Sequence, residues 1–142
     1  LERTVGTTDG GLPVVLAGRT DRLETDVDGR TTVVDFKTGR TAKTKKEAAE
    51  SRQLAAYQLL VDGEPGMTPD GAMLVYPRRD TASVTVLQQA AMSAAELEEF
   101  RALAVEAAAR VTGPVFRATA EDCESSDYAC LCPACRAGEQ VI

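Results

Sequence analysis

The stretch Val33-Val34-Asp35-Phe36-Lys37-Thr38-Gly39 decides how the rest of the chain is interpreted. It predicts a short apolar strand that ends with a carboxylate and an ammonium group two residues apart and then stops at a Thr-Gly turn. Because side chains alternate between the faces of a strand, Asp35 and Lys37 should project to one face, and Val34 and Phe36 to the other. We therefore expect one polar, chemically active face and one face that packs into the core.

A second carboxylate, Asp21, belongs to a preceding segment that we expect to pair with this strand. The connection 26–30 is compatible with two hairpin registers. A two-residue turn sets Asp21 opposite Phe36. A three-residue loop that ends with Gly29 in the left-handed conformation sets Asp21 opposite Asp35 instead, which puts both acids on one face. The sequence alone allows either register.

Length and composition predict a single globular domain. The chain has 142 residues, of which 44% are hydrophobic, which is enough for a proper core. No run reaches the roughly 18 apolar residues of a membrane helix, and the first residues do not resemble a signal peptide. We therefore expect a soluble, cytoplasmic protein. Because the chain begins at Leu1 and moves at once into strand-like sequence, we also expect it to be a piece of a longer polypeptide.

Apolar periodicity predicts a mixed α/β domain. Alternating apolar residues bounded by turn residues indicate strands, and apolar residues at helical spacing indicate helices. The run Ser93-Ala94-Ala95-Glu96 is a capping box, which marks the start of a long Ala-rich helix. Gly18 lies inside the second predicted strand, where glycine commonly marks a bulge or a close approach by another group. Besides the stretch above, the predicted strands are 1–7, 12–24, 71–76 and 82–88, and the predicted helices are 47–61 and 93–111.

The formal charge of −6 argues against a protein that holds nucleic acid over its whole surface. The four lysines nevertheless fall within ten residues, whereas the acids are spread along the chain. A short basic run is usually a solvated loop, but beside a reactive site it becomes a candidate phosphate-binding strip. The candidate DNA-binding residues that follow Lys37 are Arg40, Lys43, Lys45 and Lys46.

All four cysteines lie near the end of the chain, at Cys123, Cys130, Cys132 and Cys135. Four cysteines within thirteen residues, with none elsewhere in the chain, indicate a role other than packing in the hydrophobic core. Their spacing is not that of a paired Cys-x-x-Cys zinc knuckle, although it does not exclude zinc. Iron–sulfur sites accept more varied spacing, and a disulfide is disfavoured by the absence of a secretory signal. A metal or cluster site is the preferred interpretation.

Three motifs in order resemble those of the RecB-type branch of the PD-(D/E)XK nucleases. They are Gly18-x-x-Asp21-Arg22, Asp35-Phe36-Lys37-Thr38-Gly39 and Gln53-x-x-x-Tyr57, and the match covers most of residues 1–111. The chain is most similar to the C-terminal nuclease modules of bacterial helicase-nucleases of the AddAB and AdnAB kind. The resemblance implies a restriction-endonuclease-like α/β fold, with a mixed central sheet flanked by helices. The family's helix upstream of the first strand, which carries a further His or Glu, has no counterpart here.

The resemblance also implies a role for each motif residue. Asp21 and Asp35 would hold Mg²⁺ or Mn²⁺ together with the backbone carbonyl of Phe36, because hard cations prefer oxygen ligands. Lys37 would orient or deprotonate a metal-bound water or hold a phosphate oxygen, and Gln53 and Tyr57 would contact the DNA strand or Lys37. A surface ion pair is the usual explanation for an Asp and a Lys on one strand face, but three motifs in register make it the weaker one here.

Iron–sulfur members of the family take one cysteine from before the nuclease core and three from after it. By resemblance we assign Cys130, Cys132 and Cys135 to a [4Fe-4S] cluster of the full-length protein, with Cys123 as the extra cysteine. Residues 1–118 would then form the nuclease core, truncated at its N-terminus, and residues 119–142 a Cys-rich tail.

The resulting prediction is a Mg²⁺-dependent DNA exonuclease domain acting in double-strand-break repair or recombination. It would cut single strands delivered by a helicase motor on the same polypeptide, within a bacterial helicase-nuclease that has a second subunit. The alternative is a catalytically silent nuclease-like module that binds DNA or braces a partner subunit. A free-standing nuclease would share the chemistry and differ in context. Retention of Asp21, Asp35 and Lys37 favours catalysis over the silent module.

Overall fold

The computed structural model describes residues 1–39, 41–77 and 84–112. Residues Leu1–Ala108 form one compact unit, and Ala109–Ile142 form a second that lies mostly outside the described residues, as does the predicted boundary at 118/119. The described part is an α/β structure, as predicted. Its elements are β1 (Glu2–Thr7), β2 (Pro13–Ala17), β3 (Arg22–Thr25), β4 (Arg30–Phe36), α1 (Lys45–Ala49), α2 (Arg52–Val61), β5 (Thr68–Pro77), β6 (Val84–Gln89) and α3 (Ala94–Thr112).

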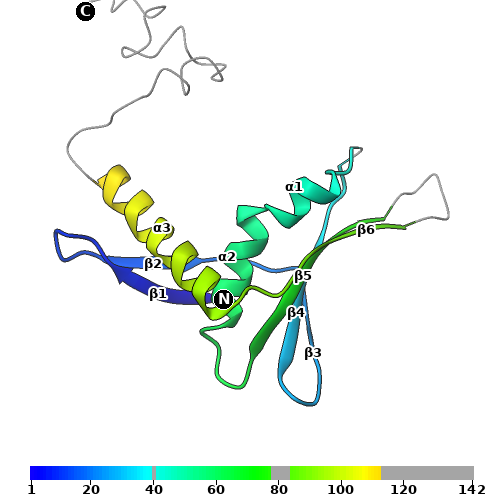
Figure 1. The fold of residues 1–142 in the computed structure, drawn as a ribbon, viewed down its shortest axis with the longest axis horizontal. Helices are drawn as coiled ribbons and strands as arrows, with labels where there is room; N and C mark the ends of the chain where they lie inside the picture. Colours follow the sequence, from blue (N-terminus) through cyan, green and yellow to red (C-terminus); the bar gives the residue numbers. More distant parts are fainter. Residues whose placement is uncertain (40, 78–83, 113–142) are drawn as a thin grey trace, which may run out of the picture. The chain divides into compact units, whose positions relative to one another are not determined.

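The strands form two sheets (Figure 1). Strands β1 and β2 make an antiparallel pair, and the larger sheet has the order β3-β4-β5-β6. Within the larger sheet β4 and β5 are parallel, whereas the other two pairs are antiparallel. The parallel pair is connected through α1 and α2, because parallel neighbours need a crossover connection. The predicted mixed sheet flanked by helices is confirmed.

The β3–β4 hairpin adopts the three-residue register. The backbone N–H of Asp26 donates to the carbonyl of Arg30, so residues 27–29 form the loop. Gly29 has φ +82°, in the left-handed region that L side chains rarely adopt. The pairing of Arg22 with Val34 follows, and continuing it by one residue sets Asp21 beside Asp35. Of the two registers that the sequence allowed, the structure has the one that brings the acids together.

The predicted single strand 12–24 is wrong. The chain breaks between β2 and β3, and the two strands belong to different sheets. Gly18 lies at the break, where a Cβ atom would be 2.9 Å from Leu60 Cδ1 and 3.2 Å from Tyr57 Cε1. Side chains of α2 therefore approach the chain closely at Gly18, where it leaves the β1–β2 pair for the larger sheet.

The predicted helix 47–61 is also two elements. Helix α1 ends at Ala49, and Ser51 begins α2 as its N-cap, with its hydroxyl accepting from the Leu54 N–H. The side chain of Gln89 donates to the carbonyls of Ala49 and Ser51, at 2.8 and 3.1 Å. These carbonyls lie at the junction of α1 and α2, where the helical hydrogen bonding is interrupted. Gln89, a residue distant in sequence, therefore supplies hydrogen bonds at the break.

Helix α2 is the centre of the core and is buried over most of its circumference. Leu54, Leu60 and Val61 pack with Val33, Leu74 and other residues of the large sheet. Full burial of one such leucine contributes about 1.5–3 kcal/mol. On its other side, Leu59 packs with residues of β1, β2 and α3, including Val5, Val14 and Leu97. Figure 1 accordingly shows α2 between the β1–β2 pair and the large sheet.

The expectation that Val34 and Phe36 face the core is wrong for Phe36. The helix-covered face of β4 is the one that carries Thr31 and Val33, both fully buried, and Asp35 continues the same alternation. Phe36 is 44% exposed, whereas Val34, on the same face of the strand, is 4% exposed. The core and the candidate catalytic residues therefore share one face, because the chain returns over that face through α1 and α2.

Helix α3 begins where the capping box predicts. The Ser93 hydroxyl accepts from the Glu96 N–H, and the Glu96 carboxylate accepts from the Ser93 N–H and hydroxyl. The hydrogen bonds with Ser93 lower the pKa of Glu96, which keeps its carboxylate charged at neutral pH.

Among the described residues, no helix is long and apolar enough to cross a membrane.

Candidate active site

The end of β4 places an acid and a base against each other. Asp35 is 5% exposed, and its Oδ2 atom lies 2.8 Å from Nζ of Lys37. The Lys37 N–H donates to the carbonyl of Val75 at 2.8 Å, so pairing with β5 continues past Phe36 and holds the Lys37 backbone in place. The two side chains therefore project to the same side, as strand alternation predicts.

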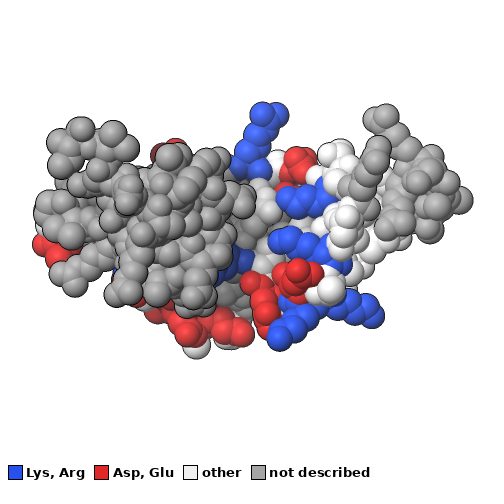
Figure 2. Space-filling view, turned by 90° about the horizontal axis from the view of Figure 1, so that it is seen from above, with Lys and Arg blue, Asp and Glu red and all other residues white. Residues whose placement is uncertain are grey.

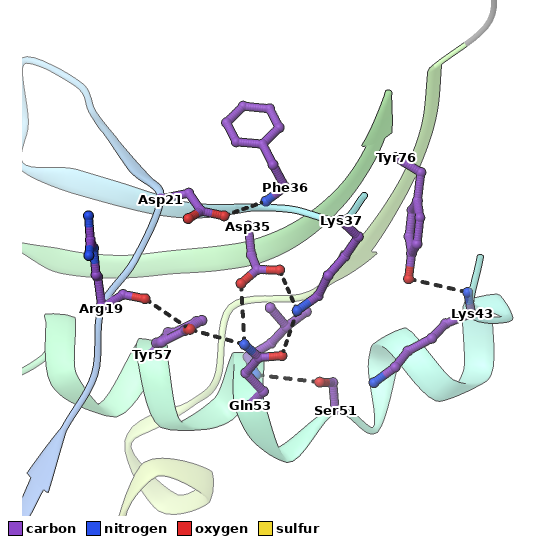
Figure 3. A network of polar contacts seen from close by, with 11 residues as sticks. Arg19, Asp21, Asp35, Phe36, Lys37, Lys43, Ser51, Gln53, Tyr57 and Tyr76 are labelled. Carbon is purple, nitrogen blue, oxygen red and sulfur yellow. Dashed lines mark hydrogen bonds and ion pairs between the residues drawn. The ribbon is translucent and has the colours of Figure 1, made fainter. Parts of the chain in front are cut away.

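Helix α2 adds Gln53 and Tyr57, which are four residues apart and share one helix face (Figure 3). The Gln53 amide nitrogen donates to Asp35 Oδ1 at 3.2 Å and contacts the Tyr57 hydroxyl at 3.0 Å. The Gln53 amide oxygen accepts from Lys37 Nζ at 3.0 Å. The Tyr57 hydroxyl donates to the carbonyl of Arg19 at 3.1 Å, which anchors the network to the break between β2 and β3. Four of the predicted site residues thus form one hydrogen-bonded group.

Asp21 joins this group through the backbone. Its Oδ2 atom accepts from the N–H of Phe36 at 2.8 Å, directly after Asp35 in the chain. Asp21 is exposed, in contrast to the buried Asp35. The site therefore combines one solvent-accessible carboxylate and one carboxylate held by Lys37 and Gln53.

The electrostatics of Lys37 follow from this geometry. Its hydrogen bond with the Asp35 carboxylate raises the pKa of Lys37 above the ordinary value, and this effect outweighs the partial burial of the side chain. Lys37 is therefore an ammonium group at neutral pH in this arrangement. In that form it acts as a positive hydrogen-bond donor and not as a proton acceptor.

The oxygen atoms present suit a hard divalent cation. Asp35 Oδ2 is a buried carboxylate oxygen whose partner among the described residues is the Lys37 ammonium, 2.8 Å away. Carboxylate oxygens are the ligands that hard divalent cations prefer. In the described part of the chain no cluster of three or more His, Cys, Asp or Glu residues has metal-binding geometry. Mg²⁺ needs only one or two carboxylates because it keeps several waters, and Asp21 and Asp35 meet that requirement.

The predicted DNA-binding lysines lie next to the site in the connection to α2. Lys43 is in the loop before α1, and Lys45 and Lys46 are in α1; all three are exposed. Figure 2 looks down on the end of the molecule that carries α1, and it shows Lys and Arg side chains gathered there, with Asp and Glu among them. Arg40 lies outside the described residues.

The predicted cluster ligands Cys123, Cys130, Cys132 and Cys135 also lie outside the described residues. Their assignment to a cluster stays a prediction, as do the individual roles of the residues at the β4 site.

The sequence reasoning missed Tyr76. This residue ends the buried part of β5, one position beyond the pairing of Phe36 with Val75, so the sheet brings it beside Lys37. Its hydroxyl accepts from the Lys43 N–H at 3.3 Å (Figure 3). The signal in the sequence was a tyrosine at the end of an otherwise apolar strand, where the ring packs inside and the hydroxyl needs a partner.

Comparison with protein families identifies the class of this protein. A family model described as the PD-(D/E)XK nuclease superfamily matches residues 1–133, and the chain belongs to this superfamily. Membership implies a nuclease, that is, a hydrolase of phosphodiester bonds, and such nucleases generally use Mg²⁺ or Mn²⁺. A comparison with curated proteins found no match.

A search of solved structures supports the same fold. The crystal structure of SSO0001 is similar, with a TM-score of 0.50 and 19% sequence identity. The similarity covers 94% of this chain and 58% of that one, so the chain spans little more than half the length of this structural neighbour. At this identity the likeness supports the fold alone.

Proposed function

We propose that this domain is a Mg²⁺-dependent DNA exonuclease of a bacterial helicase-nuclease. The observation that carries the proposal is the polar group at the end of β4. Asp35 is held by Lys37 and Gln53, and the exposed Asp21 lies next to it through the Phe36 N–H. A surface ion pair would not bury its carboxylate, nor would it recruit two further side chains from a helix.

Each residue has a task in phosphodiester hydrolysis. Asp21 and Asp35 would hold the metal ion, which would polarise the phosphate as a Lewis acid and lower the pKa of a bound water. The Lys37 ammonium neutralises charge that develops on the phosphate oxygens. Gln53 fixes the Lys37 ammonium through its amide oxygen, and Tyr57 fixes Gln53. The sequence resemblance to RecB-type modules supports DNA as the substrate.

The position of the lysines supports contact with the DNA backbone. Lys45 and Lys46 are exposed residues of the short helix α1, and Lys46 also lies in its last turn, with Nζ 4.0 Å from Glu50 Oε1. Together with Lys43 they place three ammonium groups in the connection between β4 and α2, the two elements that carry the site residues. Exposed ammonium groups in this connection are suited to contacts with phosphate groups of a bound strand.

The test compares cutting with binding in the complete polypeptide. Asp35→Asn and Lys37→Ala should each lower the rate of DNA hydrolysis at least about 100-fold, because each removes charge stabilisation that is used in the transition state. EDTA should abolish cutting, and Mg²⁺ should restore it. Asp35→Asn should also weaken Mg²⁺ binding, whereas Lys37→Ala should leave it nearly unchanged, since Lys37 acts on water or phosphate.

The control is Asp70→Asn, an exposed carboxylate on β5 that takes no part in the site. It should cut at the wild-type rate. DNA binding in Ca²⁺, measured by fluorescence anisotropy, should persist in all three variants. Wild-type cutting by both Asp35→Asn and Lys37→Ala would sink the nuclease proposal for this site and leave the silent binding module as the better account.

A further inference from the structure

A groove of about 900 Å³ has none of the candidate active-site residues in its lining. It is bounded by the α1–α2 junction, by the segment that connects β6 to α3, and by α3 itself. The helix contributes Ala102 and a stripe whose spacing of three and four residues places its members on one face: Glu96, Glu99, Phe100, Leu103 and Glu106. From 96 to 106 this stripe is about 15 Å long, or roughly three helical turns.

The floor of the groove is apolar. Ala55 of α2 is buried, Met92 and Phe100 are partly buried, and Leu103 is 41% exposed. Met92 and Phe100 also pack at the edge of the core cluster that contains Leu97, whereas Leu103 belongs to neither core cluster. The groove therefore lies where the core reaches the surface of α3, and Leu103 adds an exposed apolar side chain to that surface.

The rim of the groove is acidic. Its lining residues include four glutamates, at 50, 96, 99 and 106, and one base, Arg52. The polar group deeper in the groove is Gln89, and its amide is already engaged with Gln58 and with the carbonyls of Ala49 and Ser51. A small ligand needs several polar groups that converge on it, and this groove does not supply them. The groove has the character of a protein-docking site, with an apolar floor and a charged rim.

The negative charge of the rim distinguishes among the molecules that would fit the groove. Nucleic acid would be repelled by the glutamates. A second copy of the chain docked through the same surface would place acidic rim against acidic rim, because a two-fold interface is self-complementary. The chain's own segment 113–142 is acidic too, with five Asp or Glu against two Arg, and so is poorly matched.

We propose that the groove binds an amphipathic helix of a partner protein, with an apolar face flanked by Lys or Arg. The apolar face covers the floor formed by Met92, Phe100 and Leu103, and the basic flanks are attracted by the negative charge of the rim, to which Glu99 contributes. This is the helix-in-groove mode of recognition, in which apolar anchors at spacings of three and four residues give affinity and the rim gives selectivity. The inference does not depend on the nuclease proposal.

The test uses two synthetic helical peptides with the same leucine stripe, one flanked by lysines and the other by glutamates. Titration into the complete chain, followed by fluorescence anisotropy, should show binding of the lysine peptide that weakens as salt is added. The glutamate peptide should bind at least about tenfold more weakly, because like charges then face each other. Equal binding of both peptides, or no binding of the lysine peptide up to about 1 mM, would overturn the proposal.

Matched variants locate the binding. Leu103→Ser and Glu99→Lys should each weaken binding of the lysine peptide about tenfold or more, since the one removes an apolar anchor and the other reverses a rim charge. Leu12→Ser, in the loop between β1 and β2, and Glu2→Lys, on β1, make the same changes at exposed positions outside the groove and should leave binding unchanged. Thermal unfolding checks that all four variants fold. Equal weakening by the two pairs of variants, or concentration-dependent dimerisation that Leu103→Ser abolishes, would overturn the assignment.

Discussion

At the scale of single residues, the site depends on how one carboxylate is held. Asp35 continues a buried stripe of β4 beyond Thr31 and Val33, and it lies where the core ends and solvent begins. Lys37 and Gln53 satisfy it from the strand and from the helix, so its position is determined by two elements at once. Such a carboxylate is oriented before any substrate arrives, which is the condition for effective electrostatic catalysis.

Tyr76 gives a prediction at this scale. Its hydroxyl is the acceptor for the Lys43 N–H, while its ring packs in the core. Tyr76→Phe should keep the packing and free the loop that carries Lys43, so we expect DNA affinity to fall about two- to tenfold, the worth of one hydrogen bond. The cutting rate at saturating DNA should change little.

The matched variant is Tyr57→Phe, which removes the hydroxyl that contacts Gln53 and the Arg19 carbonyl. It should slow cutting more than it weakens binding, because it loosens Gln53 and through it Lys37. Single-turnover rates and anisotropy titrations separate the two effects. The assignment of Tyr76 to the loop and Tyr57 to the site fails if both variants change rate and affinity in the same proportion.

At the scale of secondary-structure elements, the central feature is the buried helix α2. Its N-terminal part carries Gln53 and Tyr57 to the site, and the rest of it packs against both sheets. Two contacts fix its position: Gly18 against its side, and the glutamine pair Gln58 and Gln89.

Gly18→Ala should move or destabilise α2. The added Cβ would lie within 3 Å of Leu60 Cδ1, and we expect a loss of about 1–3 kcal/mol in the free energy of unfolding, as for other overpacked sites. Gly10→Ala is the matched change, because the nearest atom to its Cβ is Thr8 Oγ1 at 3.8 Å. Urea unfolding of the two variants measures the difference. Equal stability of the two would mean that α2 is not held closely at Gly18.

Gln58→Leu tests the glutamine pair. The Gln58 side chain is fully buried, donates to Gln89 and to the Ala90 carbonyl, and accepts from the Met92 N–H. Leucine fills similar space but leaves these groups unsatisfied, so the free energy of unfolding should fall by about 1–3 kcal/mol or more.

Gln88→Leu is the control for this change, since Gln88 is exposed on β6, the strand that also carries Gln89. It should alter the free energy of unfolding by less than about 0.5 kcal/mol. The same urea titration measures both variants. If Gln58→Leu unfolds at the wild-type midpoint, the network does not stabilise the connection between β6 and α3.

At the scale of the whole molecule, charge is distributed unevenly. The net charge of −6 opposes binding of nucleic acid in general, yet Lys43, Lys45 and Lys46 are grouped in the connection between β4 and α2, the two elements that carry the site residues. The opposite condition holds at the groove on α3, where glutamates predominate. We therefore expect DNA to approach at the α1 end of the domain and to avoid the groove.

Salt dependence tests this distribution. Each of Lys43→Ala, Lys45→Ala and Lys46→Ala should weaken single-strand DNA binding and reduce the slope of log affinity against log salt by about 0.7, the value for one phosphate contact. Arg30→Ala removes the same charge at the opposite end of β4 and should leave the slope unchanged. Anisotropy titrations at several salt concentrations supply the slopes. A slope that responds equally to all four variants would mean that only net charge matters.

The sequence by itself determined the local features of this protein. The alternation in Val33–Lys37 put Asp35 and Lys37 on one side, the spacing of Gln53 and Tyr57 put them on one helix face, and the Ser93–Glu96 box marked the start of α3. These predictions held because strand and helix periods relate residues that are close in the chain. The motif order was sufficient to indicate the nuclease superfamily.

The tertiary structure decided what the local pattern left open. Both faces of β4 carry apolar residues, so alternation could not say which face α2 would cover, and Phe36 is exposed as a result. The breaks at 18–21 and at Ser51 and the role of Tyr76 likewise involve partners far away in the sequence, namely Leu60, Gln89 and Lys43. The β3–β4 hairpin also has such a partner, because the Gly29 carbonyl accepts from the N–H of Thr68. Long-range packing selects one of several locally equivalent arrangements, because only one of them buries the core and satisfies its polar groups together.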